Sequence, residues 1–154
     1  MVADRYPLPT IEDLSRDMAG SRYFSKLDLK WGYLQVPLDP EFRYLTAMIT
    51  PVGLFQWTRL PPGLCSAPSC FQKILAIILR GCKGTVHLLD DILVCGKSQR
   101  EHDERLHEVL CRLRAARVRL NGDKTVLGVT ELDFVGLHVS TQGVSPLQSN
   151  VDAV

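Results

Sequence analysis

Two adjacent carboxylates, Asp90 and Asp91, lie between short runs of branched apolar residues in the stretch VHLLDDILV (86–94). Such a pattern predicts a strand, a tight turn and a second strand. Two-residue turns favour Asn-Gly or Asp-Gly because both central residues adopt positive φ, so Asp-Asp is an unusual choice. Like charges at the tip of apolar strands also oppose each other's ionisation. A hard divalent cation would relieve that repulsion, although a solvated acidic turn would have the same sequence.

A third carboxylate, Asp28, follows a stretch (23–29) that alternates roughly as a strand. If this strand neighbours the acidic hairpin in one sheet, three carboxylates converge on one point. Two divalent ions would compensate their charge, and such a pair of ions can activate a 3′-hydroxyl and stabilise a leaving phosphate. Other chemistries have less support. No serine or cysteine lies in a nucleophile-elbow sequence, and His102 and His107, five residues apart, are expected to be solvated.

The rest of the chain must bring these carboxylates together. We expect a short helix capped by Thr10 and running to about Met18, strands over 44–49 and 54–59 joined by a turn at 50–53, a helix that begins after Ser66 or Ser69 and runs to Arg80, a long helix from Ser98 to about Val118, and a strand pair or bent strand over 132–139. Helices and hairpins in mixed order predict an α+β fold with a largely antiparallel sheet.

The long helix carries acidic residues in its first half and four arginines in and after its second half. These are Arg112, Arg114, Arg117 and Arg119. The arrangement complements the helix dipole. We therefore interpret the arginines first as helix charge design and second as a nucleic-acid patch.

The composition limits the classes of protein to which the chain can belong. The 154 residues suit one domain, with 45% hydrophobic residues, 23% charged residues and a net charge of +1. No apolar stretch approaches membrane-spanning length, and the first residues lack a secretory pattern. Five cysteines, an odd number without a C-x-x-C pair, favour reduced thiols and an intracellular protein.

Five motifs occur in an order that resembles one known family. They are YPLP (6–9), FSKLDLKWGYLQV (24–36), LPPGLCSAP (60–68), LDDILV (89–94) and FVG (134–136). Together they resemble the reverse transcriptase of gypsy-type long-terminal-repeat retrotransposons and, more distantly, of retroviruses. The resemblance covers nearly the whole chain, although each motif alone is weak.

The resemblance implies a polymerase palm with part of the fingers, performing RNA-directed DNA synthesis on a primed RNA or DNA template with deoxynucleoside triphosphates. Asp28 and Asp90 would hold two Mg²⁺ or Mn²⁺ ions, with Asp91 completing the triad and the Leu29 carbonyl a further ligand. The carboxylates should face an open surface. The helix from about Ala67 should pack its apolar residues against the other side of the sheet, namely Phe71, Ile74, Leu75 and Ile78.

The same resemblance assigns the substrate contacts. Backbone amides of Trp31 and Gly32 would face the incoming triphosphate, and Tyr33 would be an aromatic gate that clashes with a ribose 2′-hydroxyl. Pro62 would lie near the nucleotide, and Lys124 near the leaving pyrophosphate. The hairpin that grips the primer end would contain Phe134, Val135 and Gly136.

Two positions depart from the family pattern. Leu88 replaces the usual aromatic residue two before the acidic pair, and Thr125 follows Lys124 where a cysteine is common.

We also expect the upstream fingers, the thumb and the ribonuclease H domain to lie outside residues 1–154, among other domains of a pol polyprotein, so the isolated chain should be weak or inactive. The alternatives are a catalytically silent remnant and a host-adopted nucleic-acid- or protein-binding module; a metal-dependent nuclease or cyclase on a similar palm has less support.

Overall fold

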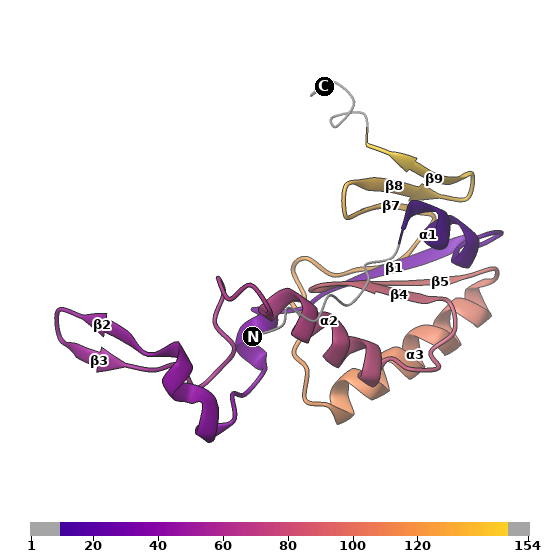
Figure 1. Cartoon of the computed structure of the whole chain (residues 1–154). Coiled ribbons are helices and arrows are strands. Elements are labelled where there is room, and N and C mark those ends of the chain that lie inside the picture. The colour runs from indigo at the N-terminus through magenta and orange to yellow at the C-terminus, as the bar shows by residue number, and fades with distance from the viewer. Residues whose placement is uncertain (1–9, 148–154) are drawn as a thin grey trace.

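Residues 10–147 are described by the computed structural model, so the YPLP motif (6–9) lies outside the described part of the chain (Figure 1). In chain order the elements are α1 (Ile11–Asp17), β1 (Tyr23–Asp28), η1 (Gly32–Gln35), η2 (Pro40–Thr46), β2 (Met48–Thr50), β3 (Gly53–Phe55), α2 (Ala67–Ile78), β4 (Thr85–Leu88), β5 (Asp91–Gly96), α3 (Gln99–Ala115), β6 (Val126–Val129), β7 (Glu131–Phe134), β8 (Leu137–Ser140) and β9 (Gly143–Pro146), where η denotes a 3₁₀ helix.

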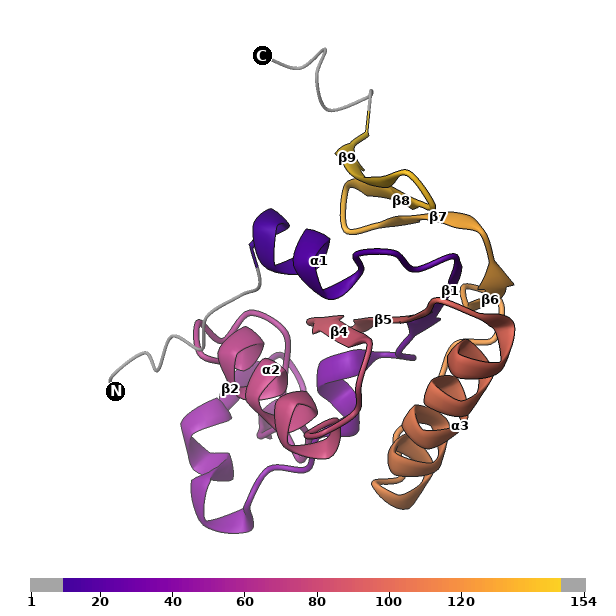
Figure 2. The same cartoon turned by 90° about the vertical axis from the view of Figure 1, so that its right-hand side faces the viewer.

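The central sheet has the strand order β4-β5-β1-β6, and β7-β8-β9 form a second sheet. Every strand pair in these sheets is antiparallel. This confirms the expected α+β class with an antiparallel sheet. Helices α2 and α3 cover one face of the central sheet, while α1 and the second sheet lie over the other (Figure 2). None of the helices among residues 10–147 is both long and apolar enough to cross a membrane.

Each face of the central sheet buries its own apolar cluster. On the α2–α3 face, Leu27 and Ile92 are fully buried together with Phe71 and Leu75 of α2. Ile74 is half-buried, and Ile78 packs against this cluster, so the predicted apolar face of α2 is confirmed. On the opposite face, Phe24 and Leu93 pack with α1 and the β7–β9 sheet, forming the second cluster. Because β1 is buried on both sides, its position is strongly constrained.

The predicted strands over 44–49 and 54–59 are only partly correct. A hairpin exists, but it is confined to β2 and β3 and extends away from the main body (Figure 1). The Asp39 side chain accepts a hydrogen bond from the Glu41 amide, and Pro40 occupies the first helical position, so a 3₁₀ helix forms through Thr46. Residues beyond β3 pair elsewhere, since the Leu38 amide donates to the Thr58 carbonyl at 3.0 Å.

The long helix α3 begins after Ser98, whose hydroxyl accepts from the Glu101 amide, and ends at Ala115, three residues before the predicted end. Arg117 adopts φ 57°, and the Val118 amide donates back to the Leu113 carbonyl, which closes the helix.

The prediction of a solvated His102 is wrong. Its side chain is buried, with Nε2 2.8 Å from the Ser25 hydroxyl of β1 and Nδ1 2.9 Å from the Asp103 carboxylate. The Ser25 hydroxyl accepts from the Gly128 amide of β6, so this polar chain ties α3 to two strands. His107 is exposed, as expected.

Candidate active site

Asp28 and Asp91 lie opposite each other in the register of β1 and β5. Opposed residues in an antiparallel pair project to the same face, and here that face is the one away from α2 and α3. The prediction that Asp28 neighbours the acidic turn on an adjacent strand is therefore confirmed. The Leu29 amide donates to the Asp90 carbonyl at 2.8 Å, which ties the end of β1 to the turn between β4 and β5.

The pKa of Asp91 lies above its ordinary value. Burial is the main cause, and repulsion from Asp90 is the next; Asp28 adds charge repulsion and a side-chain hydrogen bond. Lys26, two residues before Asp28 on the same face of β1, opposes the shift. Burial and the two neighbouring carboxylates therefore both disfavour the ionised form of Asp91. Clustered carboxylate oxygens of this kind fit a hard divalent cation.

The convergence of all three carboxylates is met only in part. Within residues 10–147 no group of three His, Cys, Asp or Glu side chains is already gathered closely enough to hold a metal ion. Asp28 and Asp91 face each other across the strands, whereas Asp90 belongs to the turn and borders a separate pocket. Leu89, at φ 53°, turns the chain between β4 and Asp90, so Asp90 does not continue the strand alternation.

Gln72 of α2 holds this turn, and the sequence analysis did not identify it. Its side chain is 2% exposed. The amide nitrogen donates to the His87 carbonyl at 2.9 Å, and the amide oxygen accepts from the Leu89 amide at 2.8 Å. A polar residue directly after Phe71 on the buried helix face was the available signal. Gln72 thus fixes the backbone that presents Asp90.

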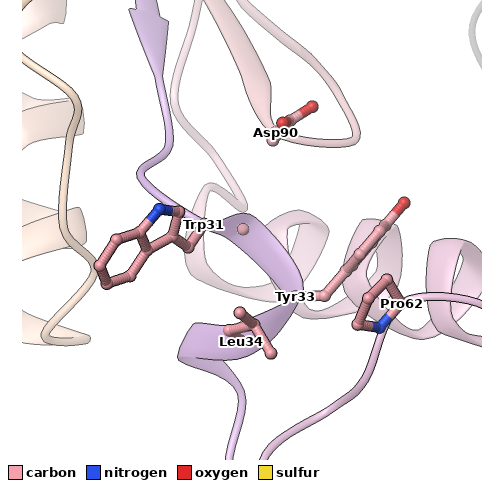
Figure 3. Close-up of a pocket in the computed structure, with 6 residues that line it drawn as sticks. Trp31, Tyr33, Leu34, Pro62 and Asp90 are labelled. Carbon is pink, nitrogen blue, oxygen red and sulfur yellow. The ribbon is translucent and has the colours of Figure 1, made fainter.

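A pocket of about 240 Å³ is lined by Trp31, Gly32, Tyr33, Leu34, Pro62 and Asp90. Four of these residues are the predicted substrate contacts, and the fifth is a predicted metal ligand; Leu34 was not predicted. Figure 3 shows Tyr33 and Pro62 on one side of the pocket, with Asp90 above them and the Trp31 ring directed away. The structure therefore brings together residues from three separate segments of the chain.

Packing explains the shape of this pocket. The Tyr33 ring contacts Phe71 of α2 edge-on, with 5.3 Å between ring centroids. Burial and the charge of Asp90 raise the pKa of the Tyr33 phenol. At Gly32, an added Cβ would lie 3.2 Å from the Asp90 Cβ and 3.4 Å from the Phe71 ring. Glycine therefore permits the close approach of η1 to the acidic turn.

The remaining predicted site residues, Lys124 and the segment 134–136, differ in how far they are buried. Lys124 is exposed on the turn before β6. Phe134 is buried, whereas Val135 and Gly136 form the β7–β8 turn at φ 49° and 76°. The Lys26 ammonium donates to the Asp133 carbonyl at 3.1 Å, which joins this hairpin to the face of β1 that bears Asp28.

Both departures from the family pattern have local partners. The Thr125 hydroxyl donates a hydrogen bond to the Asn121 carbonyl and accepts one from the Asp28 amide at 3.4 Å. Leu88 is opposite Asp91 in the β4–β5 register and packs against the core on that face.

Comparison of the sequence with protein families gives a match over residues 1–139 to the family described as reverse transcriptase (RNA-dependent DNA polymerase). Among curated proteins, the transposon Tf2-3 polyprotein of Schizosaccharomyces pombe is 36% identical over 97% of this chain and 11% of its own length. The retrovirus-related Pol polyprotein from transposon 412 of Drosophila melanogaster is 33% identical over 100% of this chain and 13% of its own length. The chain thus spans about a tenth of these relatives.

Solved structures share the fold at lower sequence identity. The foamy viral protease-reverse transcriptase in complex with RNA/DNA hybrid matches with a TM-score of 0.85 and 23% identity, over 97% of this chain and 20% of that protein. The same viral protein in complex with double-stranded DNA matches with a TM-score of 0.84 and 22% identity, over 99% of this chain and 28% of that protein.

Proposed function

Because this chain belongs to the reverse transcriptase family, we propose that it supplies the catalytic palm, with part of the fingers, of an RNA-directed DNA polymerase within a retroelement pol polyprotein. The observation that carries the proposal is the pocket in which Trp31, Gly32, Tyr33 and Pro62 adjoin Asp90. Those residues lie next to Asp28 and Asp91, a carboxylate pair on neighbouring strands. Nucleotidyl transfer requires a substrate pocket beside such carboxylates.

Reverse transcriptases generally use divalent metal ions, and the carboxylates fit such ions chemically. Asp28 and Asp90 would hold two Mg²⁺ or Mn²⁺ ions, with the Leu29 carbonyl as a further ligand. When bound, the ions supply activation of the primer 3′-hydroxyl and stabilisation of the leaving phosphate. Asp91 contributes a carboxylate beside Asp28. Its pKa is raised mainly by burial and then by repulsion from Asp90, and a bound cation would oppose that repulsion.

The chain's own residues would position the substrates. The pocket accepts the incoming deoxynucleoside triphosphate, with the Trp31 and Gly32 amides toward its phosphates. The Tyr33 ring, held against Phe71, excludes a ribose 2′-hydroxyl by contact. Lys124 would neutralise the leaving pyrophosphate.

The primer end would be held at the β7–β8 turn, where Val135 and Gly136 adopt positive φ. Phe134, buried at the base of the turn, anchors it to the core. This hairpin lies over the same face of β1 as Asp28. The partners are therefore a primed RNA or DNA template and the other domains of a pol polyprotein.

Residues 1–154 alone should synthesise DNA weakly or not at all. Positioning of primer and triphosphate supplies much of the rate of phosphoryl transfer. In this family, basic fingers residues and a thumb outside the matched motifs provide part of that positioning. A longer chain with the flanking fingers and thumb segments of a related polyprotein should therefore be active.

Primer extension on a primed RNA template tests the proposal. Three proteins are compared: the 154-residue chain, the longer chain, and the longer chain carrying Asp90→Asn. We expect synthesis only from the longer chain with Asp90 intact. Equal synthesis by the Asp90→Asn variant would refute the assigned role of Asp90. A longer chain that binds primed template but never extends it would favour the silent remnant or binding module.

A further inference from the structure

A second, larger cleft lies on the other side of η1 from the nucleotide pocket. It measures about 1020 Å³. Trp31 and Leu34 line both hollows. Figure 3 shows the Trp31 ring directed away from Asp90, Tyr33 and Pro62. The segment 31–34 is therefore a partition, with the deoxynucleotide pocket on one side and this cleft on the other.

The lining of this cleft is basic. It includes Lys30, Arg59, Arg117 and Arg119 and no acidic residue. Within the described part of the chain, none of these four side chains forms an ion pair with a carboxylate. Arg112 of α3, by contrast, pairs with Glu108 at 3.1 Å. Of the four arginines in and after the last part of α3, Arg112 therefore pairs within the helix, whereas Arg117 and Arg119 line the open cleft.

The cleft is held together by hydrogen bonds between side chains and the backbone. The side-chain Nε2 of Gln35 donates to the Arg119 carbonyl at 2.9 Å, and the side-chain Oε1 of Gln35 accepts from the Arg119 backbone amide at 2.7 Å. The Arg59 guanidinium donates to the Gln35 backbone carbonyl at 2.9 Å. These bonds join η1, residue 59 and the segment after α3. The two sides of the cleft are therefore held at a fixed spacing.

Two features point to a nucleic acid as the ligand. Trp31 is 72% exposed, and the Lys30 ammonium lies 5.1 Å from the centroid of the Trp31 ring. Unpaired bases stack on an exposed aromatic ring, and cations that have no carboxylate partner among the described residues neutralise the phosphates. Arg117 also occupies a positive-φ position that glycine would adopt with less strain. The chain thus retains a cation where backbone geometry favours glycine.

We propose that this cleft binds a short single-stranded stretch of nucleic acid, with a base stacked on Trp31 and phosphates against Arg117, Arg119, Arg59 and Lys30. The proposal rests on the proposed function only in that the chain acts on nucleic acid. It concerns a surface separate from the deoxynucleotide pocket, so binding here is measurable without catalysis.

The test uses intrinsic fluorescence. The chain has two tryptophans, and Trp57→Phe leaves Trp31 as the reporter. Oligodeoxythymidylate should quench Trp31, with an affinity that falls as salt rises. Since a single strand contributes a slope of about 0.7 per phosphate contact, the double variant Arg117→Gln, Arg119→Gln should lower the log–log salt slope by about 1.4 and weaken binding roughly tenfold at low salt.

Arg114→Gln is the matched control, because Arg114 is exposed at the same end of α3 but does not line the cleft. It removes the same charge and should leave the affinity nearly unchanged. Arg117→Gly, which relieves the positive φ, should weaken binding while the melting temperature stays the same or rises. Equal loss in Arg114→Gln, or no loss in the double variant, would overturn the proposal. Displacement of the oligonucleotide by polyglutamate at similar concentration would also overturn it, in favour of an acidic protein partner.

The failure of this proposal is distinguishable from failure of the polymerase function. Asp90→Asn should bind oligonucleotide normally while losing synthesis in the longer chain. If the chain with its native cleft does not bind the oligonucleotide while the longer chain shows Asp90-dependent synthesis, the cleft proposal alone is refuted.

Discussion

Gln72 should control both the stability of the fold and the presentation of Asp90. Its side chain is 2% exposed and makes two hydrogen bonds, to the His87 carbonyl and from the Leu89 amide. Gln72→Leu removes both bonds while preserving volume, so the cavity contribution is small. A buried backbone group left without a partner costs about 1–3 kcal/mol. Two such groups are left, the His87 carbonyl and the Leu89 amide, so we expect the variant to lose roughly 2–6 kcal/mol of unfolding free energy, a large part of the ordinary stability of a domain.

Leu89 adds a functional consequence. It adopts φ 53° directly before Asp90, a conformation that costs a branched side chain about 1–2 kcal/mol. Without Gln72, the turn is free to relax away from that strained conformation, and Asp90 moves with it. Urea unfolding measures the first effect, and Mn²⁺ titration measures the second. Gln56→Leu, at an exposed position outside the core, is the matched control and should change stability by less than about 0.5 kcal/mol. If Gln72→Leu unfolds within that range of the native chain and binds Mn²⁺ equally, the turn is held by something else.

Two further predictions concern the carboxylates and the pocket. The pKa of Asp91 is raised in the folded state, mainly by burial and then by Asp90. The stability that Asp91 contributes is therefore full below its unfolded pKa of about 4 and is lost as the pH rises through its folded pKa. Asp91→Asn should be more stable than the native chain at pH 7 without divalent ions, and urea unfolding that shows the variant to be less stable at neutral pH would contradict this. Gly32→Ala should cost about 1–3 kcal/mol, since its Cβ would lie 3.2 Å from the Asp90 Cβ. Gly122→Ala, with no atom within 4 Å of its Cβ, should be nearly neutral by thermal unfolding, and equal losses in the two variants would refute the packing argument.

The sequence was sufficient to predict the elements that local patterns determine. The Thr10 cap and the apolar face of α2 follow from local pattern, and the structure confirms them. The pairing of the Asp28 strand with the acidic hairpin is also confirmed, but spacing left it conditional and only the family resemblance predicted it. The pocket residues were predicted only because the resemblance assigned their roles, since Trp31 and Pro62 are thirty-one positions apart.

What the sequence did not predict depends on tertiary contacts. Gln72 and His102 are polar residues on helix faces, and only the packing of α2 and α3 against the sheet gives them buried partners. The strand expected at 44–49 was displaced by the cap at Asp39, which begins a 3₁₀ helix. Asp90 departs from the strand alternation because Leu89 adopts a positive φ. No pattern in the stretch 86–94 indicated that conformation at Leu89.

The central claim is that Asp28 and Asp90 hold divalent ions at the end of β1 and the β4–β5 turn. Paramagnetic broadening by Mn²⁺ in a ¹⁵N-labelled chain tests it most directly. We predict selective broadening of the amide signals of Leu29, Asp90 and Asp91, lost in the Asp28→Asn, Asp90→Asn double variant and competed by Mg²⁺. Acidic residues of α3, such as Glu104, should remain unaffected at the same Mn²⁺ concentration. Broadening that centres on α3, or that persists unchanged in the double variant, would contradict the assignment.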